Sequence, residues 1–117
     1  MVDDEAVLCE VVGRMLKTGG YRVILANSGK QALDIYSRQH QDIDLVVLDI
    51  IMPDMNGKKV YERLKKIDTK VKVLISSGYS KTGQAQAVLA DGAKDFIQKP
   101  YERMDILHKA REVLDAV

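Results

Sequence analysis

Residues 45–57 read LVVLDIIMPDMNG, an apolar run that carries one early carboxylate, Asp49, and stops against Pro53 and Gly57. The residues at 45–48 are apolar at every position, not at alternate positions. This pattern is typical of a parallel strand that helices cover on both faces. The run therefore predicts a central strand of a parallel sheet, and it places Asp49 where the burial of that strand ends.

Strand and helix patterns alternate along the rest of the chain. Strands are predicted at residues 21–26, 45–48, 71–76 and 95–97. Helices are predicted at residues 6–18, after a Ser28 cap, after Gly57, at 82–90 and from Arg103 onward. Because parallel neighbours need crossover connections, this order predicts an open, doubly wound α/β sheet with helices on both faces. Ligands of such sheets bind at the carboxyl ends of the strands.

The first strand has little chain to form it. Only Met1 and Val2 precede the acidic pair Asp3 and Asp4. Strands usually have about five or six residues, and this one should lie between two neighbours. We therefore expect a truncated first strand, and a domain less stable than one with a longer central strand.

Length, charge and cysteine content narrow the functional classes. The chain has 117 residues, 46% hydrophobic and 30% charged, which predicts one globular domain over residues 1–117. Its formal net charge of +1 gives no support for direct nucleic-acid binding. No apolar stretch approaches the roughly 20 residues that span a bilayer, so no membrane contact is expected. The single cysteine, Cys9, cannot form an intramolecular disulfide, which favours a cytoplasmic location.

Polar side chains follow the predicted strands at the ligand-binding edge: Asp3, Asp4, Asp49, Ser77 and Lys99. Each has a structural explanation when it is taken alone. Asp4 or Glu5 can cap the first helix, and Asp49 can bond the amides of a turn. Ser77 can serve a turn, and Lys99 can face solvent.

The carboxylates are harder to explain as structural residues when they are taken together. Carboxylates that converge at one strand edge repel one another unless a cation lies among them. Lys99 offers one positive charge. An all-oxygen acidic cluster suits a hard divalent ion, so the sequence predicts a Mg²⁺ site.

Motifs along the chain resemble those of one known family: VDDE at 2–5, LDIIMPDMNG at 48–57, SSGYS at 76–80 and KPY at 99–101. Through them the whole chain resembles the receiver (CheY-like) domain of two-component response regulators. The resemblance implies a flavodoxin-like (βα)5 three-layer sandwich with a five-stranded parallel sheet in the order 2-1-3-4-5.

The resemblance also implies roles at the strand edge. Asp49 would be the phosphoacceptor, whose carboxylate attacks the phosphorus of a phosphohistidine donor. Asp3, Asp4, Asp49 and the backbone carbonyl of Ile51 would bind Mg²⁺, which neutralises charge on the transferring phosphoryl group. Lys99 would pair with a phosphoryl oxygen.

A hydroxyl group would respond to phosphorylation by moving toward the phosphoryl group. We assign this role to Ser77, with Ser76 as the other candidate. The choice rests on the intervals along the chain from Asp49 to Ser77 and from Ser77 to Lys99, which resemble the family pattern. Ser76 is expected to end its strand.

An aromatic side chain would carry the response to the surface. Phe96 resembles the residue that turns inward in the family, although a plain core phenylalanine is the simpler explanation. The helix at 82–90, the strand at 95–97 and the last helix would then form the output face that a partner contacts.

The resemblance further implies a phosphodonor and a receiver of the signal. The donor would be a histidine kinase or a histidine phosphotransfer protein. Because no second domain follows Val117, the output is expected to pass to a protein target or to an output domain absent from this chain. SSGYS and KPY most resemble receiver modules of hybrid sensor kinases. A monomer or weak dimer is expected, which catalyses only its own phosphorylation and dephosphorylation.

Two other classes of function stay open. One is a phosphotransferase or phosphatase that uses an aspartyl phosphate. It would need a substrate pocket, a cap domain or an acid two residues after the nucleophile, where this chain has Ile51. The other is a pseudo-receiver that binds partners without being phosphorylated. The joint presence of the acidic residues, Ser77 and Lys99 weighs against the pseudo-receiver.

Overall fold

A computed structural model of the protein describes residues 1–50, 56–77, 83–99 and 101–115. Its helices are α1 (Ala6–Thr18), α2 (Gly29–Gln39), α3 (Gly57–Ile67), α4 (Gly83–Ala90) and α5 (Arg103–Asp115), with a 3-10 turn, η1, at His40–Asp42. Its strands are β1 (Val46–Asp49), β2 (Val73–Ser77) and β3 (Asp95–Gln98). From α2 onward, helices and strands alternate as the sequence predicts.

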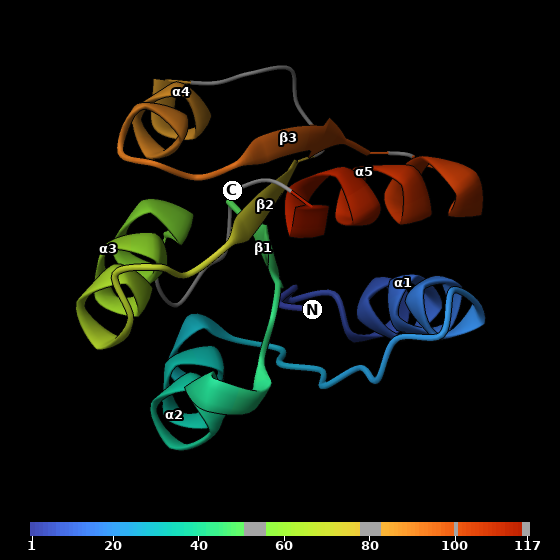
Figure 1. The fold of residues 1–117 in the computed structure, drawn as a ribbon, viewed down its shortest axis with the longest axis horizontal. Coiled ribbons are helices and arrows are strands. Elements are labelled where there is room, and N and C mark those ends of the chain that lie inside the picture. Colours follow the sequence, from blue (N-terminus) through green and yellow to red (C-terminus); the bar gives the residue numbers. More distant parts are fainter. Residues whose placement is uncertain (51–55, 78–82, 100, 116–117) are drawn as a thin grey trace.

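The strands form a parallel sheet in the order β1-β2-β3 (Figure 1). Val46 lies opposite Val73, and Leu74 lies opposite Asp95, so the carboxyl ends of the strands share one edge. α1 and α5 cover one face of the sheet, and α2, α3 and α4 cover the other (Figure 1). This is the predicted doubly wound arrangement.

β1 is buried at every position, as the apolar run at 45–48 predicts. Val47 packs in the core cluster of α1 and α5, whereas Val46 and Leu48 pack in the cluster of α2, α3 and α4. Successive side chains of a strand point to opposite faces, and here helices cover both faces. An unbroken apolar run is therefore what this strand requires.

The close approach of α3 fixes the end of the β1 segment. The amide of Gly57 donates a hydrogen bond to the carbonyl of Ile50 at 2.8 Å. A Cβ atom at Gly57 would lie 2.5 Å from the Cα of Ile50, so this position requires glycine. Asn56 then caps α3, because its Oδ1 accepts from the amide of Lys59 at 2.9 Å.

The predicted strand at 21–26 is wrong. Within the described part of the chain, residues 21–25 form no strand, and only Ala26 makes a parallel bridge, to Val2. Val2 bridges Leu48 on its other side. A strand needs a partner along its length, and only Met1 and Val2 precede the acidic pair, so the ladder beside residues 21–25 stops. The truncated first strand is thus reduced to one bridged residue.

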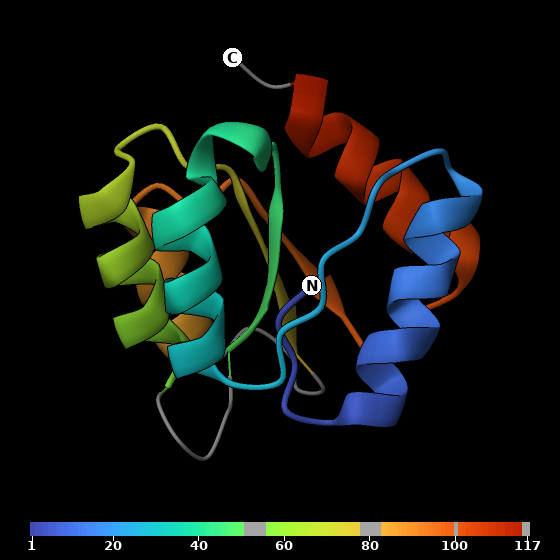
Figure 2. The ribbon, with the colours of Figure 1, turned by 90° about the horizontal axis from the view of Figure 1, so that it is seen from below.

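The bridges still preserve the predicted order of the sheet. Val2 lies between Ala26 and Leu48, which corresponds to the order 2-1-3, and β2 and β3 follow as the fourth and fifth positions. Figure 2 shows the N-terminus in the middle of the molecule, beside the light-blue segment that precedes α2.

The predicted strands at 45–48, 71–76 and 95–97 differ from β1, β2 and β3 by one or two residues at most of their ends. β2 runs to Ser77, so Ser76 does not end the strand as expected, because Ser77 still pairs with Gln98 of β3. The described part of α4 begins at Gly83, and Thr82, where that helix was predicted to begin, lies outside the described residues.

Among the described helices, none combines the length and the apolar character that crossing a bilayer requires.

Candidate functional site

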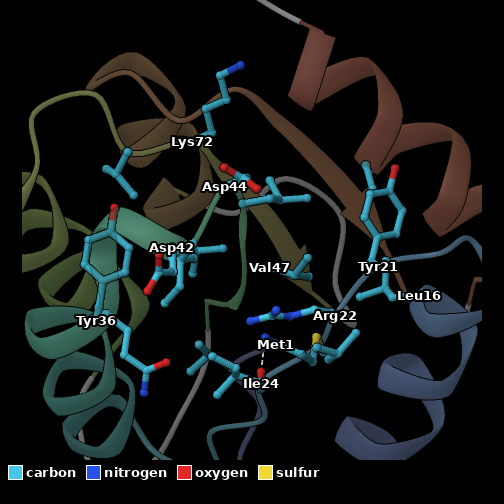
Figure 3. Close-up of a pocket in the computed structure, with 18 of the residues that line it drawn as sticks. Met1, Leu16, Tyr21, Arg22, Ile24, Tyr36, Asp42, Asp44, Val47 and Lys72 are labelled. Carbon is cyan, nitrogen blue, oxygen red and sulfur yellow. Dashed lines mark hydrogen bonds between the residues drawn. The ribbon is translucent and has the colours of Figure 1, made fainter.

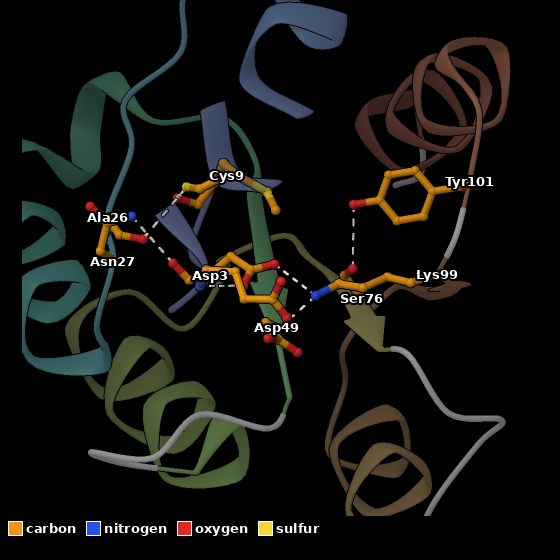
Figure 4. Close-up of polar contacts among 10 residues, drawn as sticks. Asp3, Cys9, Ala26, Asn27, Asp49, Ser76, Lys99 and Tyr101 are labelled. Carbon is orange, nitrogen blue, oxygen red and sulfur yellow. Dashed lines mark hydrogen bonds and ion pairs between the residues drawn. The ribbon is translucent and has the colours of Figure 1, made fainter. Parts of the chain in front are cut away.

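Acidic side chains meet at the carboxyl edge of the sheet. Asp3 follows the bridged residue Val2, and Asp49 ends β1 (Figure 4). Asp4 lies between Asp3 and α1. One carboxylate oxygen from each of the three aspartates lies within 4.8 Å of the others. Asp3 and Asp49 are buried, whereas Asp4 is exposed. The predicted cluster therefore forms, with one side open to solvent.

Lys99 reaches the same cluster from the end of β3. Its ammonium lies 2.7 Å from the Oδ2 of Asp3 and 3.5 Å from the Oδ2 of Asp49. Its backbone amide donates to the carbonyl of Ser77 at 2.6 Å, which fixes the residue against β2. Burial alone would lower the pKa of the Lys99 ammonium, but the hydrogen bond with Asp3 and the charge of Asp49 outweigh it and hold that pKa above its usual value.

Asp3 is held by hydrogen bonds from both its side chain and its backbone. Its side chain accepts at Oδ1 from the amide of Glu5 at 3.0 Å and at Oδ2 from Lys99. Its own amide donates to the carbonyl of Ala26 at 3.0 Å, and Asn27 donates from Nδ2 to its carbonyl at 3.4 Å. The main chain on both sides of the bridge thus holds Asp3 in place.

The donor set fits a divalent cation of the predicted kind. Three carboxylates against one ammonium leave excess negative charge in a small volume, part of it buried. Carboxylate oxygens are the ligands that Mg²⁺ prefers, and Mg²⁺ keeps several waters, which the exposed side at Asp4 admits. The fourth predicted ligand, the backbone carbonyl of Ile51, lies outside the described residues.

Both candidate serines lie in β2 and are buried. The hydroxyl of Ser76 is 3.4 Å from the hydroxyl of Tyr101 (Figure 4). Ser76 lies opposite Asp49, and Ser77 lies opposite Gln98. The structure brings both serines to the edge that carries the carboxylates, and the choice of Ser77 stays a prediction.

Phe96 lies in β3 opposite Ile75, and its ring is half-buried against the cluster of α2, α3 and α4. Side chains alternate along a strand, so Ile75 and Ser77 point to the same face of the sheet. Phe96 therefore shares a face with Ser77. This arrangement suits the predicted switch pair, whose movement stays a prediction.

Two residues that contact the site had no predicted role. The hydroxyl of Tyr101 forms a hydrogen bond with that of Ser76. Burial raises the pKa of the Tyr101 hydroxyl, and this effect outweighs the lowering by the hydrogen bond with Ser76 and by the charge of Lys99. Asn27 bonds the backbone of Asp3. The signal for Tyr101 was its place shortly after Lys99. The sequence held no signal for Asn27, because its contact depends on how the segment before α2 passes the acidic pair.

The profile of the response regulator receiver domain family matches residues 1–111. The chain is 33% identical over 115 residues to the chemotaxis protein CheY of Treponema pallidum (strain Nichols), covering 97% of this chain and 80% of that protein. It is 36% identical over 102 residues to the transcriptional regulatory protein ZraR of Escherichia coli (strain K12), covering 87% of this chain and 23% of that protein.

The chain is also 31% identical over 115 residues to the sensor kinase CckA of Brucella abortus (strain 2308), covering 98% of this chain and 12% of that protein. It therefore spans only a small part of the length of CckA and of ZraR. The activities of those whole proteins do not transfer to it directly.

Solved structures share the fold. A CheY-like receiver domain protein from Methanospirillum hungatei JF-1 matches with a TM-score of 0.90 and 29% identity, covering 97% of this chain and 90% of that one. A chain of the CheX-CheY-BeF3-Mg+2 complex from Borrelia burgdorferi matches with a TM-score of 0.90 and 29% identity. The match covers 98% of this chain and 87% of that one. These matches confirm the predicted flavodoxin-like fold. Since the family profile covers residues 1–111 and the match to CheY extends over most of both proteins, the chain belongs to the family of response regulator receiver domains.

Proposed function

We propose that Asp49 accepts a phosphoryl group from a phosphohistidine in a Mg²⁺-dependent reaction. Receiver domains are phosphoacceptor signalling domains of two-component systems, and this chain is one of them. The observation that carries the assignment is the convergence of Asp3, Asp4, Asp49 and Lys99 at one edge of the sheet. Asp49 suits the acceptor role because its carboxylate lies farther from Lys99 than that of Asp3 does.

The transfer is a substitution at phosphorus. A carboxylate oxygen of Asp49 forms the new O–P bond while the N–P bond of the donor phosphohistidine breaks, and the electron pair of that bond returns to the imidazole nitrogen. Lys99 is already within reach of Asp49 and would pair with an oxygen of the transferred group. Asp3, held at Oδ1 by the Glu5 amide, keeps the edge in position during the exchange.

Asp3, Asp4 and Asp49 would hold the metal ion. When bound, Mg²⁺ neutralises negative charge on the transferring phosphoryl group, which is the main source of catalysis in such reactions. The solved Borrelia burgdorferi complex with BeF3 and Mg+2 supports this cofactor for the fold.

The output would follow from the new charge. An aspartyl phosphate adds nearly two negative charges and strong acceptor oxygens at the edge, which would draw the hydroxyl of Ser77 toward it. Phe96 lies on the same face of the sheet, in the strand next to Ser77, and would repack when Ser77 moves. The face formed by α4, β3 and α5 would carry this change to a partner.

The donor would be a histidine kinase or a histidine phosphotransfer protein, and the target a downstream protein or an attached output domain. The match to the sensor kinase CckA supports a place in a hybrid kinase as one such arrangement. The chain would act on itself and turn over no separate substrate. A cytoplasmic location is inferred from the lone cysteine.

The assignment is tested with a small phosphodonor. The protein is incubated with Mg²⁺ and acetyl phosphate, and its intact mass is measured; the expected result is a gain of one phosphoryl group. Asp49→Ala should abolish the gain, whereas Asp44→Ala, a matched change two residues before the start of β1, should retain it. No gain in the parent protein would favour the pseudo-receiver. Sustained phosphate transfer to an added substrate would favour the phosphotransferase.

A further inference from the structure

Ser76 and Tyr101 make a contact to which the proposed reaction assigns no role. The hydroxyl of Ser76 lies 3.4 Å from the hydroxyl of Tyr101, and Figure 4 shows the two side chains pointing toward each other beside Lys99. Ser76 is fully buried in β2, and Tyr101 packs against the core cluster of α1 and α5. The Ser76–Tyr101 bond therefore connects β2 to the segment between β3 and α5.

The backbone of Ser76 is attached to the strand that ends at Asp49. Ser76 lies opposite Asp49 in the parallel register of β1 and β2. Its carbonyl accepts from the amide of Ile50, the residue after Asp49, at 3.1 Å. Ladder hydrogen bonds thus fix the position of Ser76 relative to the backbone of the nucleophile.

Tyr101 lies two residues after Lys99 in the chain. The backbone amide of Lys99 donates to the carbonyl of Ser77 at 2.6 Å, which attaches this segment to β2 at one point. The hydroxyl of Tyr101 attaches it at a second point, the side chain of Ser76. The segment that carries Lys99 is therefore held to β2 both through the backbone and through a side chain.

The two serines of β2 face opposite sides of the sheet. Leu74 packs in the cluster of α1 and α5, and Ile75 packs in the cluster of α2, α3 and α4. Since successive side chains alternate, Ser76 shares the face of Leu74 and Ser77 shares the face of Ile75. Ser77 therefore shares a face with Phe96, whereas Ser76 does not. The hydroxyl of Ser76 is thus suited to a role other than the switch.

We propose that Tyr101 is a positioning residue for Lys99, and that it acts through its hydrogen bond with Ser76. This role rests on the proposed phosphorylation of Asp49. With the Ser76–Tyr101 bond in place, the Lys99 ammonium stays 3.5 Å from the Asp49 carboxylate, where it can pair with an oxygen of the incoming phosphoryl group. Tyr101 itself takes no part in making or breaking a bond to phosphorus.

The two ion pairs of Lys99 do not by themselves hold the ammonium at the nucleophile. The ammonium lies 2.7 Å from Asp3 but 3.5 Å from Asp49, so the closer attraction is to Asp3. A loosened segment would let the ammonium follow Asp3 and leave Asp49. Small errors in the position of a group that stabilises a transition state are costly to the rate. The Ser76–Tyr101 bond should therefore affect the rate of phosphorylation more than the binding of a cation.

The effect on rate can be separated from the effect on stability. Tyr101→Phe leaves the buried hydroxyl of Ser76 without a partner, which should destabilise the fold. A double variant with Ser76→Ala and Tyr101→Phe removes both hydroxyl groups, and such a paired replacement is nearly neutral for stability. The double variant should therefore regain stability without regaining the bond.

The test measures phosphorylation by acetyl phosphate in Mg²⁺, followed by intact mass, together with the melting temperature. We expect Tyr101→Phe to slow phosphorylation about fivefold or more. It should also lower the melting temperature by about 4 °C. The double variant should melt within about 2 °C of the parent protein and stay as slow as Tyr101→Phe. Mg²⁺ affinity, measured by titration calorimetry, should not fall in either variant, because all three clustered aspartates are unchanged.

Tyr36→Phe is the matched control, because it removes a tyrosine hydroxyl whose hydrogen bond has a similar length. The Tyr36 hydroxyl donates to Asp68 at 3.5 Å. Tyr36 borders a cavity of about 1000 Å³ between the segment 21–25 and the first half of β1 (Figure 3). The described residues that line this cavity include neither Lys99 nor any of the three clustered aspartates. Tyr36→Phe should therefore keep the parent rate of phosphorylation.

A double variant that regains both the stability and the rate would give Tyr101 a structural role only and would overturn the proposal. An unchanged rate in Tyr101→Phe would do the same. A fall in Mg²⁺ affinity that matches the fall in rate would also count against it, because it would indicate a damaged acidic cluster. In each of these cases the parent protein is phosphorylated at Asp49. If the parent protein gains no phosphoryl group, the proposed function fails, and the role of Tyr101 fails with it.

Discussion

The ammonium of Lys99 lies 2.7 Å from the carboxylate of Asp3, although 96 positions of sequence separate the two residues. The beginning and the end of the chain are thus joined at the acidic edge. Asp3 is buried and Lys99 is mostly buried, so neither charge is well screened by water.

Replacing Lys99 by methionine tests this pair. Lys99→Met keeps most of the side-chain stem but leaves Asp3 buried without its cation. In Mg²⁺-free buffer the free energy of unfolding, measured with urea, should fall by about 3 kcal/mol. Lys109→Met is the control, because the Lys109 pair with Asp95 is about one-third exposed and its loss should cost less than about 1 kcal/mol. Equal losses in the two variants would contradict a special role for the Lys99 pair.

Removing the exposed carboxylate of the cluster should have the opposite effect on stability. Asp4→Asn relieves repulsion with Asp3 and Asp49, so it should raise the melting temperature in Mg²⁺-free buffer and weaken Mg²⁺ binding about tenfold or more. Titration calorimetry measures the affinity. Glu10→Gln, the same charge change on the exposed face of α1, should leave both quantities nearly unchanged.

Replacing Gly57 by alanine tests the close contact between the start of α3 and the backbone that follows β1. Gly57→Ala places a Cβ 2.5 Å from the backbone of Ile50, and should lower the free energy of unfolding by about 2 kcal/mol. In a helix alanine is otherwise favoured over glycine by about 1 kcal/mol. Gly13→Ala is the matched control, since its Cβ would approach closely only the movable end of the Leu25 side chain, at 2.9 Å, and would make an ordinary contact with Val23 at 3.5 Å. Urea unfolding of both variants should give clearly different changes, and similar values would disprove the steric argument.

Ionisation of the Tyr36 hydroxyl should destabilise the folded protein at alkaline pH. Burial, followed by the nearby charge of Asp68 and the hydrogen bond to it, raises the pKa of Tyr36 to about 12. An unfolded tyrosine ionises near about pH 10, so between these values the unfolded state binds fewer protons. The contribution of Tyr36 is therefore complete below about pH 10 and is lost as the pH rises toward about 12. Urea unfolding across this range should show a shallower decline for Tyr36→Phe than for the parent chain, and parallel curves would exclude the effect.

Exposed apolar residues lie beside the acidic edge. We expect a protein phosphodonor to dock on them. Val7 in the first turn of α1 and Met104 in the first turn of α5 are 77% and 65% exposed. Val7→Glu with Met104→Glu should slow phosphorylation by a protein donor about tenfold or more, because apolar contacts with the donor are lost. Phosphorylation by acetyl phosphate, which needs no docking surface, should keep its rate. A drop with both donors would indicate damage to the site itself.

The sequence predicted the parts of the fold that depend on local patterns. β1 was recognisable because an unbroken apolar run needs two covered faces, and α2 because Ser28 can cap it, which it does by accepting from the Gln31 amide. The strand at 21–26 was predicted from residues that favour strands, but a strand also needs a partner, and the partner stops at Met1. Composition within the segment could not reveal that.

The site was predictable to a similar extent. Asp3, Asp49 and Lys99 follow strands, so parallel topology alone brings them to one edge. The burial of Asp3 and the exposure of Asp4 were not predictable, because they depend on how the segment before α2 and the start of α1 pack around the pair. The contact of Tyr101 with Ser76 depends on side-chain directions that spacing does not give.

The bridged residue Val2 is one of the contacts that position Asp3. Val2 is the link that holds Asp3 against Ala26 and β1, so any process that orders Val2 also orders a cation ligand. Ordering of Val2 and binding of a cation at the acidic edge should therefore stabilise each other reciprocally. By thermodynamic linkage, the factor by which the bridged state of Val2 tightens cation binding equals the factor by which the cation favours that bridged state.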